Sequence, residues 1–200
     1  MKEDTNLLYG GSMRPGQDLV AAGYIALKGT VLLAVLGEPE LKTRFTAQFV
    51  RRCQRVYENA QAVRTFMEAG EEVLGATGAE SFCMAGEGGV MAALWDYFDA
   101  YGLGFEMELR KLPLLQETVE VCEVFDVNPY RLRSEGCVLL TAANGGALVR
   151  KLKKQGIPAV VIGRTAKGIG RKINNGGIQT FLDKPKPDEL YKIQLTGGKL

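Results

Sequence analysis

The sequence predicts a mixed α/β fold in which helices cover a mixed β-sheet. Two observations predict it. Apolar runs of strand length alternate along the chain with segments of helical periodicity, in the order strand, helices, strand, helix, strand, helix, strand, hairpin. The 200 residues are 46% hydrophobic, which suffices for one globular core without a disulfide or a structural metal.

The first part of the chain predicts one strand and one short helix. Residues 1–13 are expected to form a flexible leader, residues 14–193 a single domain and residues 194–200 a tail. A turn signal precedes residues 19–25, an apolar run of strand length. Residues 31–36 follow a glycine-containing turn, which favours a short buried helix over the alternative of a second strand.

Residues 39–69 carry apolar side chains at three-, four- and seven-residue steps, which predicts helix with one face toward the core. A single helix of this length is long for such a domain, so a break inside it is expected. The predicted core-facing stripe consists of Leu41, Phe45, Phe49, Val56, Ala60, Val63 and Met67.

The second part of the chain predicts a regular alternation of elements, bounded by glycine, proline and asparagine. In order, these are a helix opening at residues 86–89, a strand at 105–109, a helix at 116–125, a strand at 137–142, a helix capped by Asn144 and ended by Gly156, a strand at 159–163, a hairpin at 171–182 and a short anchor at 190–193.

Charge and hydropathy argue against two classes of partner. The formal net charge is +2 with acids and bases balanced, so no basic field for nucleic acid is expected. No apolar run approaches the ~20 residues of a membrane span, and no signal peptide is recognised, so we expect a cytoplasmic protein without a membrane partner.

Cysteine and histidine usage restricts the chemistry. The four cysteines are scattered among apolar neighbours, which favours buried free thiols over ligands or disulfides. Histidine is absent, which excludes a Ser-His-Asp or Cys-His mechanism and a histidine-based metal site within this chain. No metal-binding residue is therefore expected.

Seven short segments occur in a characteristic order between residues 14 and 193. They are residues 14–20; 25–30; 86–90 with 93–95; 112–114 before 117–122; 128–130 before 134–136; 161–163; and 188–191. In this order they resemble the C-terminal domain of the AIR-synthase (aminoimidazole ribonucleotide synthase) superfamily. The resemblance is strongest to the AIR synthase-related proteins of the hydrogenase-maturation branch.

This resemblance implies a three-layer α/β/α domain that normally follows an N-terminal ATP-binding domain. Members of the superfamily dimerise and activate an amide or related oxygen by ATP-dependent phosphorylation. The residues that hold Mg-ATP lie mostly in the N-terminal domain, for which this sequence shows no counterpart. Because phosphoryl transfer depends on positioned cations and donors, we expect no catalytic residue here, and no cofactor unless a partner supplies the site for ATP and magnesium.

Departures from the family pattern support that expectation. The superfamily carries Asp-x-Thr-x-Gly-Gly at the start of the central helix, whereas here Met84 replaces the acid and Gly86 the hydroxyl residue. A methionine cannot orient a metal-bound water as a carboxylate does. Ala26 stands where relatives usually have glycine, which hinders close approach of a ligand to the backbone.

The candidate anion- or nucleotide-binding residues are Gly29, Thr30, Glu87, Gly88, Gly89, Ser134, Glu135 and Gly136. The turns at Gly88-Gly89 and Gly29-Thr30 are each expected either to present helix N-terminal amides to an anion or to pack tightly for steric reasons.

The remaining candidates resemble family features or carry charge. Residues 134–136 resemble a family loop, although backbone geometry alone explains their glycine. Glu87 and Glu135 are either an acid–base pair or ordinary exposed glutamates. A basic cluster at residues 164–172 either contacts a phosphate or an acidic partner surface, or is a solvated hairpin edge.

Two functions of different class follow. The first is a domain without catalysis of its own that depends on a partner and supplies a docking or anion-binding surface. The alternative is the C-terminal half of a split ATP-dependent enzyme whose ATP-binding domain is a separate chain; a third is a piece of a longer enzyme. We expect self-association or a separate protein partner, with residues 31–36 as a candidate surface if they are exposed.

Overall fold

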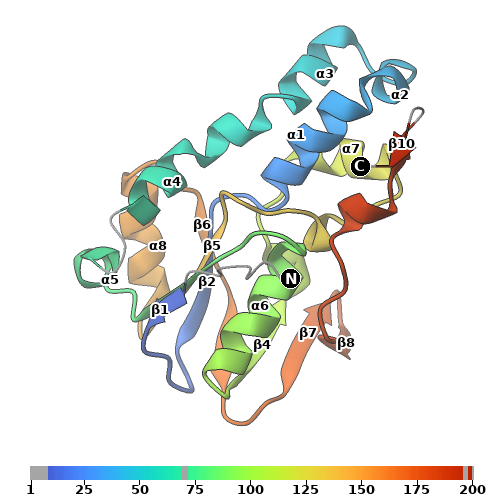
Figure 1. Cartoon of the computed structure of the whole chain (residues 1–200). Coiled ribbons are helices and arrows are strands. Elements are labelled where there is room, and N and C mark those ends of the chain that lie inside the picture. The colour runs from blue at the N-terminus through green and yellow to red at the C-terminus, as the bar shows by residue number, and fades with distance from the viewer. Residues whose placement is uncertain (1–8, 69–71, 196–197, 200) are drawn as a thin grey trace, which may run out of the picture.

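The computed structural model describes residues 9–68, 72–195 and 198–199 (Figure 1). Its centre is an eight-stranded sheet in the order β1-β3-β5-β2-β6-β4-β7-β8. Neighbouring strands are antiparallel except β4 and β7, which run parallel, so the predicted mixed sheet is confirmed. The strands are β1 (Tyr9–Gly11), β2 (Asp18–Ala22), β3 (Ser81–Met84), β4 (Gly104–Glu108), β5 (Val138–Ala142), β6 (Ala159–Ala166), β7 (Arg171–Asn175) and β8 (Ile178–Phe181).

Helices connect and cover these strands. They are α1 (Leu27–Leu36), α2 (Glu38–Lys42), α3 (Ala47–Cys53), α4 (Gln61–Glu68), α5 (Glu72–Thr77), α6 (Gly89–Ala100), α7 (Gln116–Val124) and α8 (Gly145–Lys154), with 3₁₀ turns η1 (Val56–Ala60), η2 (Leu109–Lys111), η3 (Pro129–Arg131) and η4 (Glu189–Lys192). A short pair, β9 (Gln194–Leu195) and β10 (Gly198–Lys199), forms within the expected tail. In the described part of the chain, no helix combines the length and apolar character required to cross a bilayer.

The central strands are apolar on both faces, which explains why helices cover both. Along β2, Leu19 and Ala21 join the core beneath α6, whereas Val20 and Ala22 join the core beneath α4 and α8. The result is the three-layer arrangement that the resemblance implied (Figure 1). Helices α1, α2, α3 and α7 pack together beyond one end of the sheet.

The structure corrects the predicted start of the domain. Residues 9–11 were placed in the flexible leader, but they form β1 and pair antiparallel with β3. Gly11 permits this close pairing, since a Cβ there would lie 2.2 Å from the carbonyl oxygen of Glu80. Residues 1–8 of the expected leader lie outside the described residues.

Helix α1 begins at Leu27, four positions before the helix predicted over residues 31–36, and the alternative of a strand there is wrong. Its N-cap, Ala26, has a φ of 60°, a left-handed conformation that alanine rarely adopts. Val35 and Leu36 at the other end of α1 are exposed, at 53% and 42%, while Leu33 and Ala34 are buried. Residues 31–36 were predicted as a contact surface only if they are exposed, and this holds for the last two of them.

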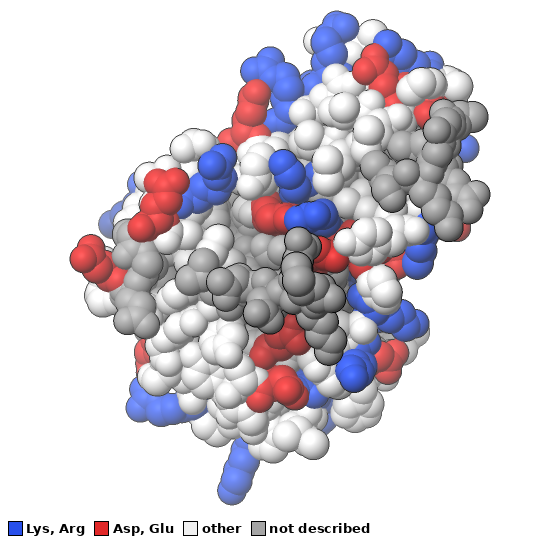
Figure 2. All heavy atoms as spheres, in the orientation of Figure 1, with Lys and Arg blue, Asp and Glu red and all other residues white. Residues whose placement is uncertain are grey.

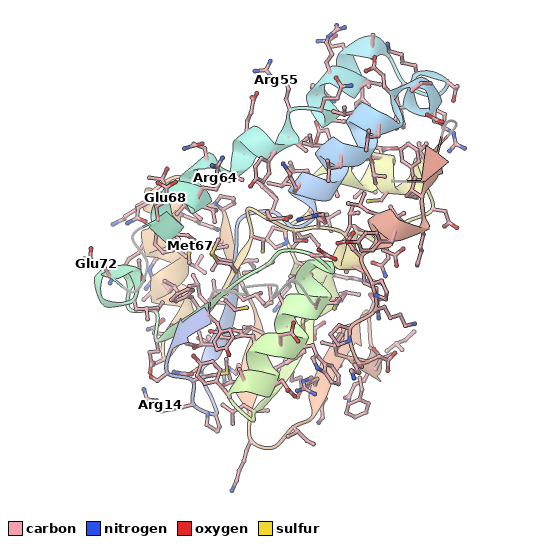
Figure 3. All side chains as sticks on the ribbon, viewed as in Figure 1. Arg14, Arg55, Arg64, Met67, Glu68 and Glu72 are labelled. Carbon is pink, nitrogen blue, oxygen red and sulfur yellow. The ribbon has the colours of Figure 1, made fainter. Side chains whose placement is uncertain are left out.

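The helical pattern of residues 39–69 is broken more often than predicted, into α2, α3, η1 and α4. The stripe still faces the core. Val56, Ala60, Val63 and Met67 are buried, and the two phenylalanines of the stripe pack against the main core. In Figure 3, Met67 points toward the body of the molecule and Arg64 away from it. Positions 69–71 lie outside the described residues.

Candidate anion-binding site

The three predicted site segments meet at the N-terminus of α6. The backbone amide of Gly29 donates to the carbonyl oxygen of Arg133 at 3.1 Å, and the amide of Ser134 donates to the carbonyl oxygen of Gly86 at 3.0 Å. The structure thus brings together segments that are far apart in the sequence, Gly29 and Arg133 by more than 100 positions. It adds a fourth segment, η4, for which the sequence suggested no role in binding.

The turn before α6 requires both glycines. Gly88 and Gly89 have φ angles of 74° and 70°, which L side chains rarely adopt. A Cβ on Gly89 would lie 2.5 Å from the carbonyl oxygen of Tyr130. The packing interpretation of this turn is therefore sufficient to explain Gly89.

The anion position at this helix N-terminus is filled by the protein's own carboxylate. Asp188, which is 1% exposed, accepts a hydrogen bond from the Gly88 amide through Oδ2 at 2.8 Å. Its Oδ1 accepts from the amide of Leu190 at 3.0 Å. A carboxylate at a helix N-terminus interacts favourably with the exposed amides and with the helix dipole. Asp188 therefore lies where one of the two predicted interpretations of this turn placed a bound anion.

Charged side chains surround this carboxylate. Burial raises the pKa of Asp188 above its ordinary value, while the amides of Leu190 and Gly88 and the nearby Arg133 oppose the shift. Arg133 forms an ion pair with Glu135 at 2.6 Å, which raises the pKa of the guanidinium. Glu87 accepts from the hydroxyl of Tyr191 at 2.8 Å. Each of the two predicted glutamates thus has a partner within the protein, Tyr191 for Glu87 and Arg133 for Glu135.

Ser134 is a buried connector. Its Oγ accepts from the amide of Ala26 at 2.9 Å and donates to the carbonyl oxygen of Leu132 at 2.8 Å. The hydroxyl therefore satisfies the first amide of the left-handed turn that starts α1. Gly136 contacts the helical layer instead, where a Cβ would lie 2.5 Å from that of Ala60.

Gly29 and Thr30 lie inside the first turn of α1 rather than in a loop before it. Both are buried, and the amide of Thr30 donates to the carbonyl oxygen of Ala26. The Thr30 hydroxyl donates to the same carbonyl at 2.8 Å and lies 3.0 Å from the hydroxyl of Thr118. The amides of Gly29 and Thr30 and the Thr30 hydroxyl therefore all have hydrogen-bond partners within the protein.

The positions that depart from the family motif differ in their surroundings. Met84 ends β3 and is half-buried. A Cβ added at Gly86 would meet nothing within 4 Å, so the loop has room for the hydroxyl side chain that the family motif carries there. Lack of space therefore does not explain why glycine, rather than a hydroxyl residue, occupies position 86.

Two further predictions concern reactive and basic groups. All four cysteines are buried and free, and burial raises the pKa of Cys53 to about 11 and of Cys122 to about 12. The basic cluster is divided between ion pairs: Arg164 contacts Asp18, whereas Arg171 contacts Asp99. Among the described residues no group of three or more histidine, cysteine or acidic side chains is arranged to hold a metal ion.

Sequence reasoning missed Asp188 and Arg133 as members of the site. Asp188 belongs to one of the seven resembling segments, but its sequence neighbours, between prolines and a short apolar anchor, gave no sign that its carboxylate reaches α6. The only available signal was the presence of an acid in a segment otherwise expected to anchor the end of the domain.

The model of the family "AIR synthase related protein, C-terminal domain" matches residues 14–173. Among solved structures, Escherichia coli HypE, a hydrogenase maturation protein, is similar with a TM-score of 0.66 and 20% identity over 93% of this chain and 55% of its own. HypE in the HypE–HypF complex gives 0.62 and 19% over 88% and 55%. Thiamine monophosphate kinase from Aquifex aeolicus gives 0.57 and 18% over 84% and 52%. A comparison with curated proteins found no match.

Proposed function

Because the chain belongs to the family of AIR synthase-related proteins, C-terminal domain, we propose that its domain is a docking unit that depends on a partner for any catalysis. The observation that carries this proposal is the buried Asp188 carboxylate at the N-terminus of α6. An anionic substrate group reaching the Gly88 amide would have to displace it. Met84 and Gly86 add to the argument, since neither supplies the acid or hydroxyl of the family motif.

The partner in this proposal supplies the ATP- and magnesium-binding groups. This chain spans about half the length of the solved structures that it matches. One of them is a complex between HypE and a second protein, HypF, which supports partner binding as a mode of action for this fold. We propose that the partner here is either a second copy or a separate protein, in the cytoplasm.

ATP turnover tests the lack of catalysis. The purified 200-residue chain with ATP and Mg²⁺ is expected to release no phosphate above the buffer rate. Size-exclusion chromatography with light scattering tests the partner, and a complex with itself or with a co-expressed protein is expected. Steady ATP hydrolysis by the chain alone would overturn the first part, and a strict monomer that recovers no partner would overturn the second.

The alternative is one half of a split ATP-dependent enzyme. The open space at Gly86 favours it, since the loop before α6 keeps a shape that a ligand-binding residue would fit. Co-expression with a candidate ATP-binding domain separates the two functions. ATP turnover that appears only in the mixture supports the split enzyme, and complex formation without turnover supports the docking unit.

A further inference from the structure

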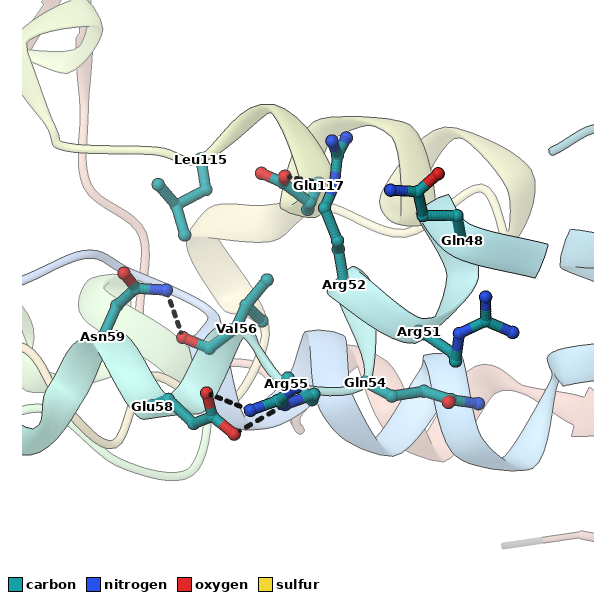
Figure 4. A pocket seen from close by; sticks show the side chains of 10 residues that line it. All are labelled: Gln48, Arg51, Arg52, Gln54, Arg55, Val56, Glu58, Asn59, Leu115 and Glu117. Carbon is teal, nitrogen blue, oxygen red and sulfur yellow. Dashed lines mark hydrogen bonds and ion pairs between the residues drawn. The ribbon is translucent and has the colours of Figure 1, made fainter. Parts of the chain in front are cut away.

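A cleft of about 740 Å³ lies on the helical layer (Figure 4). One wall is formed by α3 and η1, and the other by the first residues of α7. Arg51, Arg52 and Arg55 contribute to the first wall, and Leu115 and Glu117 to the second. The cleft therefore combines guanidinium groups with an apolar side chain within one small area.

The arginines of this cleft are held by weak interactions. Arg55 pairs with Glu58 at 2.8 Å, but both side chains are mostly exposed, at 72% and 65%. Arg52 lies 3.4 Å from Glu117 and is 60% exposed. The side chain of Arg51 makes no hydrogen bond or ion pair among the described residues, although the charge of Glu38 is near enough to interact with it. Exposed ion pairs contribute about 0–1 kcal/mol, so an incoming anion can compete for these guanidinium groups at little cost.

Two further cations extend the basic surface around η1. Lys28 of α1 and Arg64 of α4 lie over the ring of Tyr57, at 5.2 and 5.7 Å from its centre. Five cations thus lie on and around α3 and η1, against the carboxylates of Glu58 and Glu117 in the cleft and of Glu38, which accepts from the cleft residue Gln54. Figure 2 shows acidic and basic side chains interspersed over the face it draws, so a local excess of one sign differs from that general pattern.

The floor of the cleft is apolar. Val56 is 4% exposed and belongs to a small core with Leu27 and Ala60, against which the half-buried Leu115 packs. In Figure 4 Arg52 and Arg55 lie on either side of Val56, and Leu115 lies on the opposite wall. A ligand that fits this cleft carries negative groups for the rim and one apolar group for the floor.

The exposure of the walls favours a protein segment over a small molecule. Small-molecule sites usually enclose most of the ligand surface, whereas the arginines here remain largely in solvent. A protein surface laid across the cleft would cover these side chains, and arginine is enriched in protein interfaces. Glu58 and Glu117 already pair with Arg55 and Arg52, which shows that these guanidinium groups bind carboxylates.

We propose that the cleft between α3, η1 and α7 docks an acidic segment of a partner protein, with carboxylates on Arg51, Arg52 and Arg55 and one apolar side chain on Val56 and Leu115. This inference rests on the partner dependence proposed above and names the chemistry of the partner. It is tested by peptide binding in the absence of ATP, so its failure is distinguishable from the appearance of ATP turnover.

The probes are fluorescein-labelled twelve-residue peptides, and the readout is fluorescence anisotropy. The first peptide is rich in glutamate with a leucine at every fourth position; the second has serine for each leucine, and the third has lysine for each glutamate. The full chain is expected to bind the first peptide, more weakly at higher salt. Binding is expected to fall about tenfold for the serine peptide and to vanish for the lysine peptide.

The decisive variant is Arg51→Ala with Arg55→Ala, and its matched control is Arg150→Ala with Lys154→Ala, an exposed basic pair of the same spacing on α8. The first variant is expected to weaken binding at least about tenfold and the control less than about twofold. Circular dichroism verifies that both remain folded.

Three results would overturn the proposal. They are no binding of the leucine peptide at about 1 mM, equal losses in the two double variants, or equal binding of the serine peptide. Inorganic tripolyphosphate is the competitor in a final arm. If it binds the cleft with one-to-one stoichiometry and more tightly than the leucine peptide, the cleft is a small-anion site and the proposal fails.

Discussion

The carboxylate of Asp188 lies 2.8 Å from the backbone amide of Gly88, although the two residues are 100 positions apart in the sequence. This contact fixes the segment before η4 against the start of α6. A free helix N-terminus attracts anions because its first amides lack partners within the helix. Here the chain provides that anion itself, and the contact therefore stabilises the fold at the N-terminus of α6.

Replacing Asp188 tests the strength of this contact. Asp188→Ala removes both acceptor oxygens and is expected to lower the free energy of unfolding by about 2 kcal/mol, whereas Asp188→Asn keeps one acceptor and is expected to cost about 1 kcal/mol. Urea unfolding followed by circular dichroism measures both. Asp183→Ala, on an exposed side chain of the same segment, is the control. Equal stability of Asp188→Ala and Asp183→Ala would show that the contact contributes nothing.

The glycines before α6 provide a matched pair. Gly89→Ala is expected to destabilise by about 3 kcal/mol or more, because its Cβ would meet the Tyr130 carbonyl at a φ of 70°. Gly86→Ala, three residues earlier, adds a methyl group to open space and is expected to change stability by less than about 0.5 kcal/mol. Thermal denaturation measures the stability of both variants. Similar losses would mean that Gly89 is not required for steric reasons.

The elements predicted correctly from the sequence are those whose signals are local. Asn144 precedes α8 and caps it, with its side-chain oxygen 2.9 Å from the amide of Ala147, and Gly156 follows its end. Helix α7 starts at Gln116, as the sequence predicted. Strand β5 carries five buried residues in a row, a pattern that indicates a central strand. In each case the residues that define the element lie within it or next to it.

What the sequence left unpredicted depends on distant contacts. Tyr9–Gly11 contains two glycines and no alternation, and it becomes a strand only because β3 lies beside it. Strand β3 itself was not predicted. The site follows the same rule. Its loops were identified from the resemblance, but the arrival of Asp188 at α6 depends on the tertiary path of a proline-containing segment, which local patterns do not encode.

Ser134 tests whether a candidate binding residue is structural. Ser134→Ala leaves the buried amide of Ala26 without its acceptor, so a loss of about 2 kcal/mol in unfolding free energy is expected. The control is Ser12→Ala at an exposed position, with an expected change below about 0.5 kcal/mol. Guanidinium unfolding measures both variants. Unchanged stability of Ser134→Ala would contradict the role of this hydroxyl as a connector between the two loops.

Arg171 couples β7 to α6 through a buried guanidinium. It lies 3.9 Å from the ring centre of Trp95 and forms an ion pair with Asp99 at 2.8 Å. Arg171→Ala is expected to destabilise by about 2 kcal/mol. Since Trp95 is the single tryptophan, its emission reports this contact directly and is expected to shift to the red as water reaches the ring.

The control for this prediction is Arg164→Ala, which removes an exposed arginine from the ion pair with Asp18. It is expected to leave the tryptophan emission unchanged and to cost less than about 1 kcal/mol. Arg171→Lys retains the charge without the planar group, so its emission is expected to lie between those of the wild type and Arg171→Ala. An unshifted spectrum for Arg171→Ala would contradict the stacking.

Glu80 gives the domain a pH-dependent contribution at the start of the sheet. Burial acts to raise its pKa, but the Arg14 guanidinium, the neighbouring Gln17 side chain and the amide of Ala143 outweigh burial and hold the pKa below the ordinary glutamate value of 4.5. A folded-state pKa that is lowered stabilises the fold above the unfolded-state pKa, and the contribution disappears as the pH falls through the folded-state value. Glu80→Gln is therefore expected to cost about 1 kcal/mol at pH 7 and progressively less below pH 4.5. Urea unfolding of wild type and Glu80→Gln from pH 3 to pH 7 measures the difference in unfolding free energy. Arg14→Gln is expected to show a smaller change of the same sign. A difference that grows as the pH falls would contradict the direction of the pKa shift.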